Sequence, residues 1–586
     1  MARAVRIANA SGFLGDRASA LAEMVEGGEV DVVTGDYLAE LTLLVLGKQR
    51  LRDPDAGYAR AFLRHLEPVL ATVLERGIRV VVNAGGLNPA GLAAELRRLA
   101  GALGLAPAVA TVTGDDLRPR LRELLDTGLA LPDPASGPPP PATAPVLTAN
   151  AYLGAWGIVA ALQAGADIVV CPRVTDASLV VGPAAWWHGW DREAWDALAG
   201  AVVAGHVLEC GAQATGGNYS GFSTVTDLRH PGFPLAEVAA DGSCVVTKHP
   251  GTQGAVTVGT VTAQLLYEIG SARYLNPDVT TLLDSVRLAA AGPDRVAVTG
   301  TRGAPPPPTT KVAVTTHGGW RNEATFVLTG LDLEAKAEVF TAAARAALAG
   351  APLQVEFQRV GTAAVDAADQ DGASALLRVV ATSADEAAAG RAFSGALVEL
   401  ALASYPGLYA TAPPGPATAI GAISSLLVAQ GVPRHEVVLP SGDRELVAPP
   451  HVTGDPPAQP PPREAEASRD WGPRMAVPLG VVADARSGDK GSSANVGVWV
   501  RGERAYTWLT AELTVARFRD LVPETARLPV TRTELANLWG LNFLIADLLP
   551  GGAGATTRFD RQAKGLAEFL RSRTVDVPVT VLDEPA

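Results

Sequence analysis

The chain has 586 residues and a formal net charge of −13, from 48 Lys and Arg against 61 Asp and Glu. This length exceeds one hydrophobic core and predicts about three or four domains, while the acidic balance argues against nucleic acid or anionic lipid as a partner. Three cysteines without CxxC spacing argue against a disulfide framework and a structural zinc site, and no run of about 18 apolar residues is present to cross a bilayer, so we expect a cytoplasmic protein.

Residues 1–245 repeat a pattern of strand, loop and helix. Short apolar runs predict strands at 5–8, 30–33, 80–82, 108–112 and 168–170. The segments 18–27, 59–76 and 90–103 between them have helical periodicity. Buried strands that alternate with helices indicate an α/β fold with a doubly wound, mostly parallel sheet.

Residues 246–453 change to an α+β pattern. Strands at 311–315, 324–328, 353–358 and 376–381, with helices at 333–348 and 384–402, predict a split β-α-β sandwich subdomain. Four-proline runs at 138–141 and 305–308 are typical of loops, and the proline-rich segment 454–475 predicts the main linker. Residues 476–586 then predict a second small α+β domain, with strands at 478–484, 495–500 and 541–549 and helices at 513–521 and 559–570.

Each predicted strand of the first domain ends in a polar, often glycine-bearing turn. The carboxyl ends of parallel strands share one edge of the sheet, where ligands bind. Such side chains are also ordinary helix N-caps, so the alternative for each one alone is a structural role. Together they predict one polar crevice. The candidate ligand contacts are Ser11, Gly12, Asp16, Asp36, Asn83, Gly85, Gly86, Asp116, Arg173, Thr175 and Asp176.

Acidic residues in these turns also allow a divalent cation, although spacing alone does not bring them together. The aspartates concerned are Asp16, Asp36, Asp115, Asp116 and Asp176. Common cofactor signatures are absent: the sequence from Ser11 lacks the first glycine of G-x-G-x-x-G, and neither a P-loop nor a G-x-S-x-G motif occurs. The sequence therefore identifies no nucleotide cofactor, and a divalent cation stays open as an alternative.

A second group of candidates lies outside these turns. On a helix, His206 and Cys210 share a face, so the imidazole can take the thiol proton and yield a nucleophile; the alternative is a buried structural cysteine. Glycine-rich or cationic segments elsewhere are suited to a carboxylate, phosphate or thioester oxygen. Their candidate residues are Gly216, Gly217, Asn218 and Lys248, together with Arg486 and Lys490 in a predicted turn between two strands.

Six segments together resemble the acyclic terpene utilisation (AtuA) family. They begin at Ser11 (SGFLGDR), Thr34 (TGDYLAELT), Asn83 (NAGGLNP), Glu209 (ECGAQATGGN), Lys248 (KHPGT) and Arg486 (RSGDKG). The resemblance covers nearly the whole chain and implies a C-terminal ferredoxin-like domain. Leu14 stands where members of the family usually have an aromatic residue. The family is associated with breakdown of branched isoprenoid acids as coenzyme A thioesters, with no settled reaction or catalytic residues.

We expect an enzyme that acts on an acyl-coenzyme A or related carboxylate, by hydration, dehydration or C–C cleavage beside the thioester carbonyl. Backbone donors of Gly85, Gly86, Gly216 and Gly217 are expected to stabilise an oxyanion, while Asp36 or Asp176 moves the proton. One alternative is a non-catalytic scaffold or regulatory subunit of an acyl-CoA carboxylase-type complex. Another is a Cys210-dependent acyl transferase or thioester hydrolase. We also expect a homo-oligomer.

Overall fold

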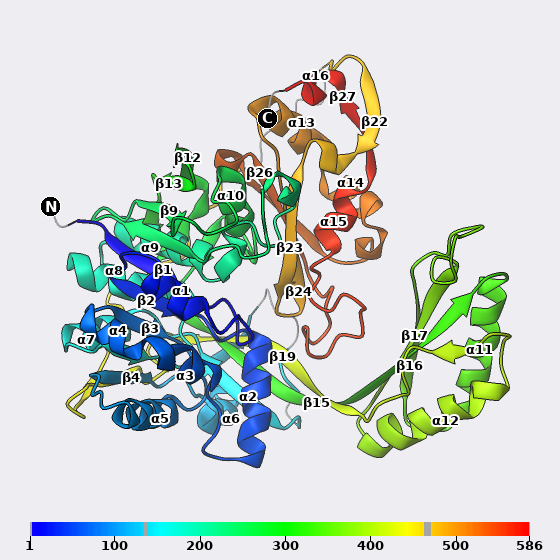
Figure 1. The fold of residues 1–586 in the computed structure, drawn as a ribbon, viewed down its shortest axis with the longest axis horizontal. Helices are drawn as coiled ribbons and strands as arrows, with labels where there is room; N and C mark the ends of the chain where they lie inside the picture. Colours follow the sequence, from blue (N-terminus) through cyan, green and yellow to red (C-terminus); the bar gives the residue numbers. More distant parts are fainter. Residues whose placement is uncertain (1–2, 134–138, 142, 462–469, 585–586) are drawn as a thin grey trace.

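The body of the molecule is built on one eleven-stranded sheet (Figure 1). The structure is a computed structural model that describes residues 3–133, 139–141, 143–461 and 470–584. Five neighbouring strands in this sheet run parallel, in the order β1-β2-β3-β7-β4. Their bounds are β1 (Val5–Asn9), β2 (Val32–Gly35), β3 (Arg79–Val82), β7 (Ile168–Val170) and β4 (Val109–Thr113). These are the five strands that the apolar runs predict, to within two residues.

Helices flank these strands as their apolar periodicity predicts. Asn88 caps α5 (Pro89–Ala102) through its side chain, and the helix buries Leu92 and Leu96 against the sheet. The predicted helix 59–76 is interrupted, because Pro68 has no N–H to continue the hydrogen bonding. Its three parts are α3 (Ala61–Leu66), a 3₁₀ turn (Glu67–Val69) and α4 (Leu70–Glu75). The other helices of this region are α1 (Ala20–Glu26), α2 (Glu40–Arg52), α6 (Leu121–Asp126), α7 (Trp156–Gln163), α8 (Ser178–His188) and α9 (Trp195–Leu208).

Antiparallel strands extend the parallel group on both sides, so the chain is a mixed α/β protein. Beyond β1 the order is β8, β9, β13 and β12, and beyond β4 it is β20 and β21. Their bounds are β8 (Pro234–Val238), β9 (Cys244–Lys248), β13 (Arg295–Thr299), β12 (Arg287–Gly292), β20 (Glu436–Val438) and β21 (Arg444–Leu446). The sequence pattern did not reveal these flanks, because apolar runs do not encode the direction of the neighbouring strand.

The predicted boundary between residues 245 and 246 falls inside β9, in a hairpin that β8 and β9 form. Strands β20 and β21 also return to the first sheet. Residues 246–305 remain with the body as well, through α10 (Val258–Leu265) and a small sheet of β10 (Arg273–Leu275), β11 (Thr280–Leu282) and β14 (Arg302–Ala304). Residues 246–453 are thus divided among three sheets: the eleven-stranded sheet, this small sheet and a seven-stranded sheet.

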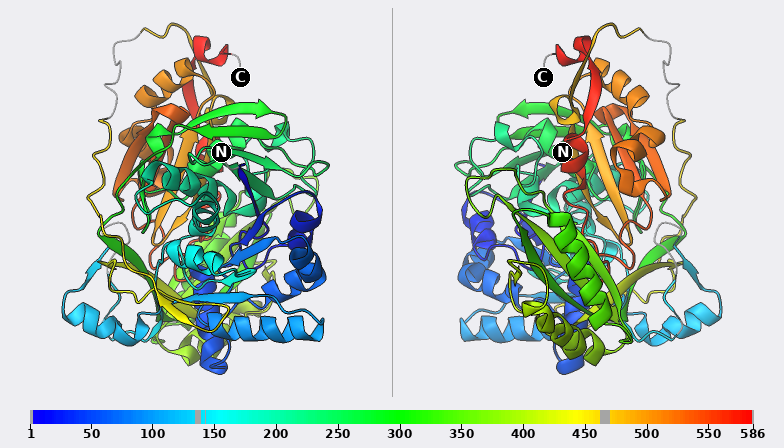
Figure 2. Two further views of the ribbon diagram at one scale, coloured as in Figure 1. Left: turned by 90° about the vertical axis from the view of Figure 1, so that its left-hand side faces the viewer. Right: turned by 90° about the vertical axis from the view of Figure 1, so that its right-hand side faces the viewer.

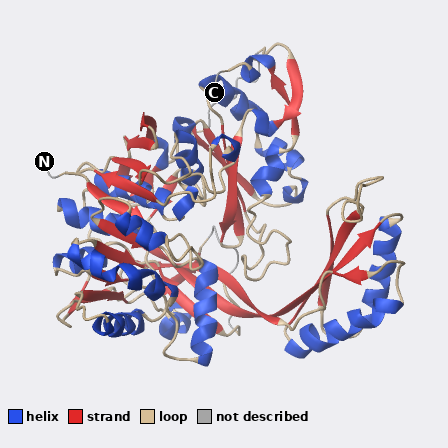
Figure 3. Cartoon of the chain, in the orientation of Figure 1, coloured by secondary structure: helices blue, strands red, loops and turns tan. Residues whose placement is uncertain are grey.

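A second, seven-stranded sheet leads from the body into a projecting arm (Figures 1 and 3). Its central strand β15 (Thr309–Thr329) is 21 residues long and replaces the two predicted strands 311–315 and 324–328. The intervening residues form a bulge against β19 between His317 and Trp320, where Gly319 takes a φ of 100°. The other strands are β5 (Ala130–Pro132), β6 (Val146–Ala151), β16 (Gln354–Val360), β17 (Ser374–Ser383), β18 (Tyr409–Ala410) and β19 (Thr418–Ala429).

Two helices close the core of the arm. Phe340 on α11 (Leu333–Ala347) and Phe393 on α12 (Phe393–Glu399) are fully buried there. The predicted helix 384–402 contains a π-helical turn (Ala388–Ala392), α12, and a 3₁₀ turn (Leu400–Leu402).

The C-terminal domain is a four-stranded antiparallel sheet, in the order β23-β24-β26-β25, with helices against it. Its elements are β22 (Arg474–Pro478), β23 (Asp484–Lys490), β24 (Ser493–Trp499), α13 (Glu503–Glu512), α14 (Val515–Leu521), β25 (Val530–Leu535), β26 (Gly540–Ile545), α15 (Leu566–Arg571), β27 (Thr574–Pro578) and α16 (Val579–Leu582). The predicted strand 478–484 is a 3₁₀ turn (Leu479–Val481), and the predicted helix 559–570 begins only at Leu566.

The predicted linker starts along one side of the molecule (Figure 2). Arg273 holds it by donating to the carbonyl oxygens of Pro457 at 2.9 Å and Ala458 at 2.8 Å. Its residues 462–469, and Pro138 of the first proline run, lie outside the described residues. Within the described ranges, no helix combines the length and the apolar character needed to span a bilayer.

Candidate functional site

Hydrogen bonds join the five strand-end turns into one polar edge. The amide of Asp36 donates to the carbonyl of Ser11 at 2.9 Å, which links the turns after β1 and β2. Asn83 Nδ2 donates to Asp36 Oδ1 at 2.6 Å and links β2 to β3. The amide of Arg173, after β7, donates to Asp115 Oδ2 after β4 at 3.2 Å. The predicted convergence of these turns is therefore present in the fold.

Arg173 holds the centre of this edge. Its side chain is only 3% exposed and pairs with Asp176 at 2.9 Å, while Nη1 donates to the carbonyl of Leu38 at 2.6 Å. The guanidinium also lies over the ring of Tyr152, 4.1 Å from the centroid. Asp176, in contrast, keeps 28% of its side chain exposed. Asp176 is therefore the more solvent-accessible residue of this ion pair.

Asp36 lies behind this pair as a buried carboxyl group. Burial, together with the nearby charge of Asp176, raises the pKa of Asp36 well above its usual range. Arg173 and the hydrogen bond from Asn83 act in the opposite direction without cancelling the shift. A carboxyl group with a raised pKa beside an ion pair is a common feature of proton-transfer sites.

Glu209 and His206 form a second buried acid–base pair, with His206 Nδ1 and Glu209 Oε1 2.9 Å apart. Burial lowers the pKa of His206 to about 4, so the imidazole is neutral at pH 7. Burial and the charges of Asp176 and Glu268 raise the pKa of Glu209 well above its usual range. Within the described residues, His206 Nε2 and Glu209 Oε2 are buried without a hydrogen-bond partner. The pair thus has hydrogen-bonding capacity left for a ligand.

The predicted pairing of His206 with Cys210 is not formed. The helix α9 ends at Leu208, and the imidazole bonds to Glu209 instead. Burial, with the charges of Glu209 and Glu268, raises the pKa of the Cys210 thiol well above its usual range. A nucleophilic cysteine needs the opposite shift. Cys210 is thus a packed thiol, whose backbone lies against Gly12.

The three thiols should resist alkylation in the folded protein. Burial raises the pKa of Cys244 to about 12 and raises the pKa of Cys171 and Cys210 as well. Because only the thiolate reacts, we expect iodoacetamide at pH 8 to label all three in denaturant and none within minutes in the native state. Intact-mass spectrometry gives the count, and rapid native labelling of Cys210 would restore it as a candidate nucleophile.

The glycine amides do not supply the oxyanion donors that we predicted. Gly85 N–H donates to the carbonyl of Cys171 at 3.1 Å, and the amides of Gly86, Gly216 and Gly217 also bond to backbone carbonyls. The glycines serve close packing instead. A Cβ at Gly85 would lie 2.6 Å from the Cys171 oxygen. The groups that stabilise an oxyanion at this edge must therefore be side chains with a positive charge.

Several predicted contacts lie away from the centre. Asp16 accepts from the amide of Gly12 at 2.7 Å, and Ser11 Oγ donates to backbone carbonyls, so both shape the turn after β1. Asp116 is exposed and accepts from the amide of Arg118. In the remaining cases, Thr175 and Ser178 bond to each other at 2.5 Å at the start of α8, and Lys248 pairs with Asp294 at 3.1 Å.

The C-terminal domain brings Arg486 and Lys490 to the body within the same chain. Both lie on β23, not in a turn as predicted, because only Gly491 and Ser492 separate β23 from β24. Arg486 Nη1 donates to the carbonyl of Asn218 at 2.9 Å. Lys490 Nζ donates to the carbonyl of Glu268 at 2.8 Å. Its positive charge acts to lower the pKa of Glu209, against the effect of burial.

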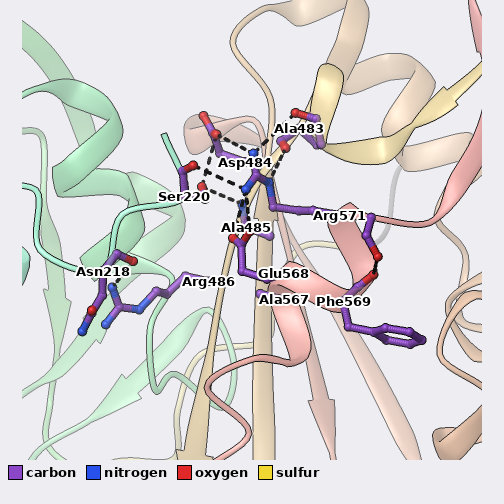
Figure 4. A network of polar contacts seen from close by, with 12 residues as sticks. Asn218, Ser220, Ala483, Asp484, Ala485, Arg486, Ala567, Glu568, Phe569 and Arg571 are labelled. Atoms are coloured by element: carbon purple, nitrogen blue, oxygen red, sulfur yellow. Dashed lines mark hydrogen bonds and ion pairs between the residues drawn. The ribbon is translucent and has the colours of Figure 1, made fainter. Parts of the chain in front are cut away.

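A polar network fixes this contact (Figure 4). Asp484, 3% exposed, accepts from Ser220 Oγ at 3.2 Å, and Ser220 Oγ accepts from the amide of Ala485 at 3.2 Å. Arg571 pairs with Asp484 at 3.8 Å and donates to the carbonyl of Ser220 at 3.4 Å. The strand that carries Arg486 and Lys490 is thereby held beside the residues that follow α9.

We did not predict Glu209, Glu268 or Tyr274 as site residues from the sequence. The ring of Tyr274 lies 4.9 Å from that of His206, and its pKa is raised well above its usual range, first by burial and then by Glu209. Glu209 is the first residue of the glycine-rich segment ECGAQATGGN. Its acidic side chain at that position was the signal in the sequence from which it could have been predicted as a site residue. Glu268 and Tyr274 carry no comparable local pattern, because long-range packing places them here.

Asp115 should make the protein less stable as the pH rises. Burial raises its pKa from 3.8 to about 7, despite bonds from Asn150 and Arg173. The native carboxyl group then holds a proton that the unfolded chain has lost above pH 4, so the free energy of unfolding falls between pH 4 and 7, by up to about 1.4 kcal/mol per pH unit. In urea unfolding, the free energy of unfolding of Asp115→Asn should fall less steeply between pH 4 and 7 than that of wild type. Asp116→Asn should show the same fall as wild type. An unchanged slope in Asp115→Asn would contradict the assignment.

Five aspartates in these turns were the alternative ligands that we considered for a divalent cation. Among the described residues, no three His, Cys, Asp or Glu side chains are placed to hold one metal ion. The site consists instead of carboxyl groups (Asp36, Asp176 and Glu209), a neutral imidazole (His206) and two cations (Arg173 and Lys490). Such a set can donate and accept protons beside positive charge.

Two family models match the chain. The model described as acyclic terpene utilisation family protein AtuA matches residues 5–439, and the AtuA ferredoxin-like domain matches residues 477–576. No curated protein and no solved structure gives a significant match. The two matched ranges include every side chain of the acid–base site, and they agree with the resemblance seen in the sequence. The chain therefore belongs to the acyclic terpene utilisation family AtuA and carries an AtuA ferredoxin-like domain.

Proposed function

We propose that the protein is an enzyme that moves a proton at the carbon beside a thioester or carboxylate carbonyl. The observation that carries this proposal is the placement of Asp176, a partly exposed carboxylate whose charge raises the pKa of two buried carboxyl groups, Asp36 and Glu209. Carboxyl groups whose environments separate their proton affinities are suited to act as base and acid in one reaction.

In a dehydration, Asp176 takes the proton from C2 of a 3-hydroxyacyl thioester. The C3–O bond breaks, the oxygen leaves as water with the proton of Glu209, and the C2–C3 double bond forms. Hydration is the reverse. In a C–C cleavage, Asp176 takes the proton of the C3 hydroxyl group, the C2–C3 bond breaks as the C3 carbonyl forms, and Glu209 gives its proton to C2 of the departing enolate. Arg173 and Lys490 provide the positive charge that stabilises the enolate, since the glycine amides are already bonded.

Coenzyme A thioesters are the proposed substrate class, because the family is named for acyclic terpene utilisation and the resemblance implies a thioester route. A cytoplasmic location remains part of the proposal. The Cys210-dependent alternative is not retained, because burial and nearby carboxylates raise the pKa of its thiol.

We further propose that the arm contacts a second copy of the chain. It exposes large apolar side chains to solvent, with Leu331 82%, Val339 52%, Val398 57% and Leu402 101% exposed. Apolar surface of this kind is often covered in an assembly. The same surface is also compatible with a scaffold role in a carboxylase-type complex. A pull-down from the producing cell separates the two, since a scaffold should bring down stoichiometric carboxylase subunits.

A panel of 3-hydroxyacyl, 2-enoyl and 3-hydroxy-3-methylacyl thioesters of coenzyme A tests the activity. We expect at least one thioester to raise the melting temperature and to change mass by one water or to split in two. If no thioester is converted, even with the folded protein at a concentration similar to that of the thioester, the proposal is contradicted.

A further inference from the structure

Four cations meet where α2, the arm and the C-terminal domain come together. They are Lys48 on α2, Arg321 on β15, Arg378 on β17 and Arg561 in the segment before α15. Lys48 Nζ donates to the carbonyl of Ala419 at 2.8 Å, and Arg321 Nη1 donates to the carbonyl of Thr556 at 3.1 Å. This group stands out in a chain with a net charge of −13.

Only part of this positive charge is paired. Arg378 and Arg561 share one oxygen of Glu323, at 2.6 and 2.7 Å. Glu356 lies nearby and accepts from Thr557 Oγ1 at 2.9 Å. Glu323 is thus the one carboxylate of the described residues that pairs with these four cations. Among the described residues, neither Lys48 nor Arg321 forms an ion pair with a carboxylate.

The unpaired cations repel each other. The pKa of Lys48 is lowered by burial and by the charge of Arg321. Burial and the charge of Arg561 lower the pKa of Arg321 to about 10, with Arg378 adding to the effect and Glu323 opposing it. Like charges held together in a partly buried place destabilise the free protein, and an anion between them relieves that repulsion.

We propose that Lys48, Arg321 and Arg561 bind a phosphate or diphosphate group. The two unpaired positive charges match a doubly charged anion, and guanidinium groups bind phosphate oxygens with two parallel hydrogen bonds. The site joins three parts of the molecule, because its residues come from the body, the arm and the C-terminal domain. A bound phosphate therefore stabilises their mutual contact.

This site also deepens the proposed function, on which the identity of the ligand rests. Helix α2 starts just after Asp36, and Lys48 lies eight residues into it, about 12 Å along its axis. The cations thus lie beyond the acid–base edge, at a separate place. In a coenzyme A thioester the phosphates are distant from the acyl carbonyl. The site is suited to hold those phosphates while the acyl group occupies the edge.

The test uses the full chain and calorimetric titration at fixed ionic strength, with pyrophosphate and with adenosine 3′,5′-bisphosphate. We expect the double variant Lys48→Gln/Arg321→Gln to bind both probes about 100-fold more weakly, at about tenfold for each lost charge-assisted bond. Without phosphate it should melt at the same or a higher temperature, because the repulsion is gone. Arg359→Gln, which removes an arginine paired with Glu334 elsewhere on the arm, should bind as wild type does.

Each outcome bears on one proposal alone. Unchanged affinity in the double variant, or no binding of either probe to wild type, overturns the phosphate site. Binding of pyrophosphate but not of the nucleotide keeps a phosphate site and overturns its link to coenzyme A. If a thioester is converted, the double variant should raise KM with little change in kcat. Phosphate binding without conversion of any thioester leaves this site standing and overturns the proposed function.

Discussion

Replacing Asp176 with asparagine is expected to lower kcat by about 10²- to 10⁴-fold, the usual contribution of a general base. Asparagine keeps an oxygen for the bond to Arg173 but cannot accept the proton of the substrate carbon. Glu209→Gln should cause a loss of similar size, because it removes the proton that the leaving oxygen receives. Initial rates with the thioester that wild type converts measure both effects.

Controls separate chemistry from folding in these variants. Arg173 is 3% exposed and loses its counter-charge in Asp176→Asn, so some loss of stability is expected there. Glu209→Gln removes a carboxyl group whose pKa burial has raised, and it should be as stable as wild type at pH 7 or more so. Asp116→Asn, an exposed aspartate at the same edge, should keep full activity. Full activity in both Asp176→Asn and Glu209→Gln would remove these residues from the mechanism.

Replacing Asn495 with alanine is expected to lower the free energy of unfolding by about 3 to 5 kcal/mol. Asn495 is fully buried between the C-terminal domain and the body. Its side chain donates to the carbonyl of Leu266 at 2.8 Å and to Asn542 Oδ1 at 2.7 Å, and it accepts from the amide of Glu268 at 2.8 Å. Alanine leaves two buried polar groups and the partly buried amide of Glu268 without a partner, and the low end of the usual cost of about 1 to 3 kcal/mol for each group gives this total.

Urea unfolding and limited proteolysis measure this effect. The matched control is Gln562→Ala, an exposed amide of the same domain, which should change stability by less than about 0.5 kcal/mol. We also expect proteolysis to release the C-terminal domain of Asn495→Ala sooner than that of wild type. Equal stability of the two variants would show that the domain contact does not depend on this side chain.

The shared edge of the site was predictable because it follows from local pattern. Apolar runs locate β1, β2, β3, β7 and β4, and parallel strands necessarily end on the same side of a sheet. The turn residues after them, such as Asp36 and Asp176, therefore meet whatever the rest of the chain does. The family and its C-terminal ferredoxin-like domain were likewise foreseen from motifs.

Other features depend on contacts that a local pattern does not contain. The 21-residue strand β15 is continuous because β17 and β19 pair along it, whereas its glycines look like a break in the sequence. The motif at Arg486 looks like a turn because it is polar and contains glycine. It is a strand because its side chains face polar partners on the body, among them Asn218 and Glu268.

The role of the glycines was misread for a related reason. Gly85 and Gly86 were expected to expose backbone donors, but the amides satisfy neighbouring carbonyls of the same edge. Buried backbone donors are nearly always paired within the protein. The polar capacity left over lies in side chains instead, and the strongest case is the pair of His206 and Glu209. Burial of carboxyl groups with raised pKa costs stability, which is a common feature of sites kept for function.

Exchange of the C2 proton of a thioester in D₂O tests directly whether Asp176 removes a proton from this carbon. We expect wild type to incorporate deuterium at C2 of the thioester that it binds, read by mass spectrometry, and we expect Asp176→Asn and Glu209→Gln to differ from each other. The first variant should incorporate none, whereas the second should still exchange because it blocks only departure of the oxygen. No deuterium with any bound thioester, or equal incorporation by Asp176→Asn and wild type, would contradict the role of Asp176 as the base at C2.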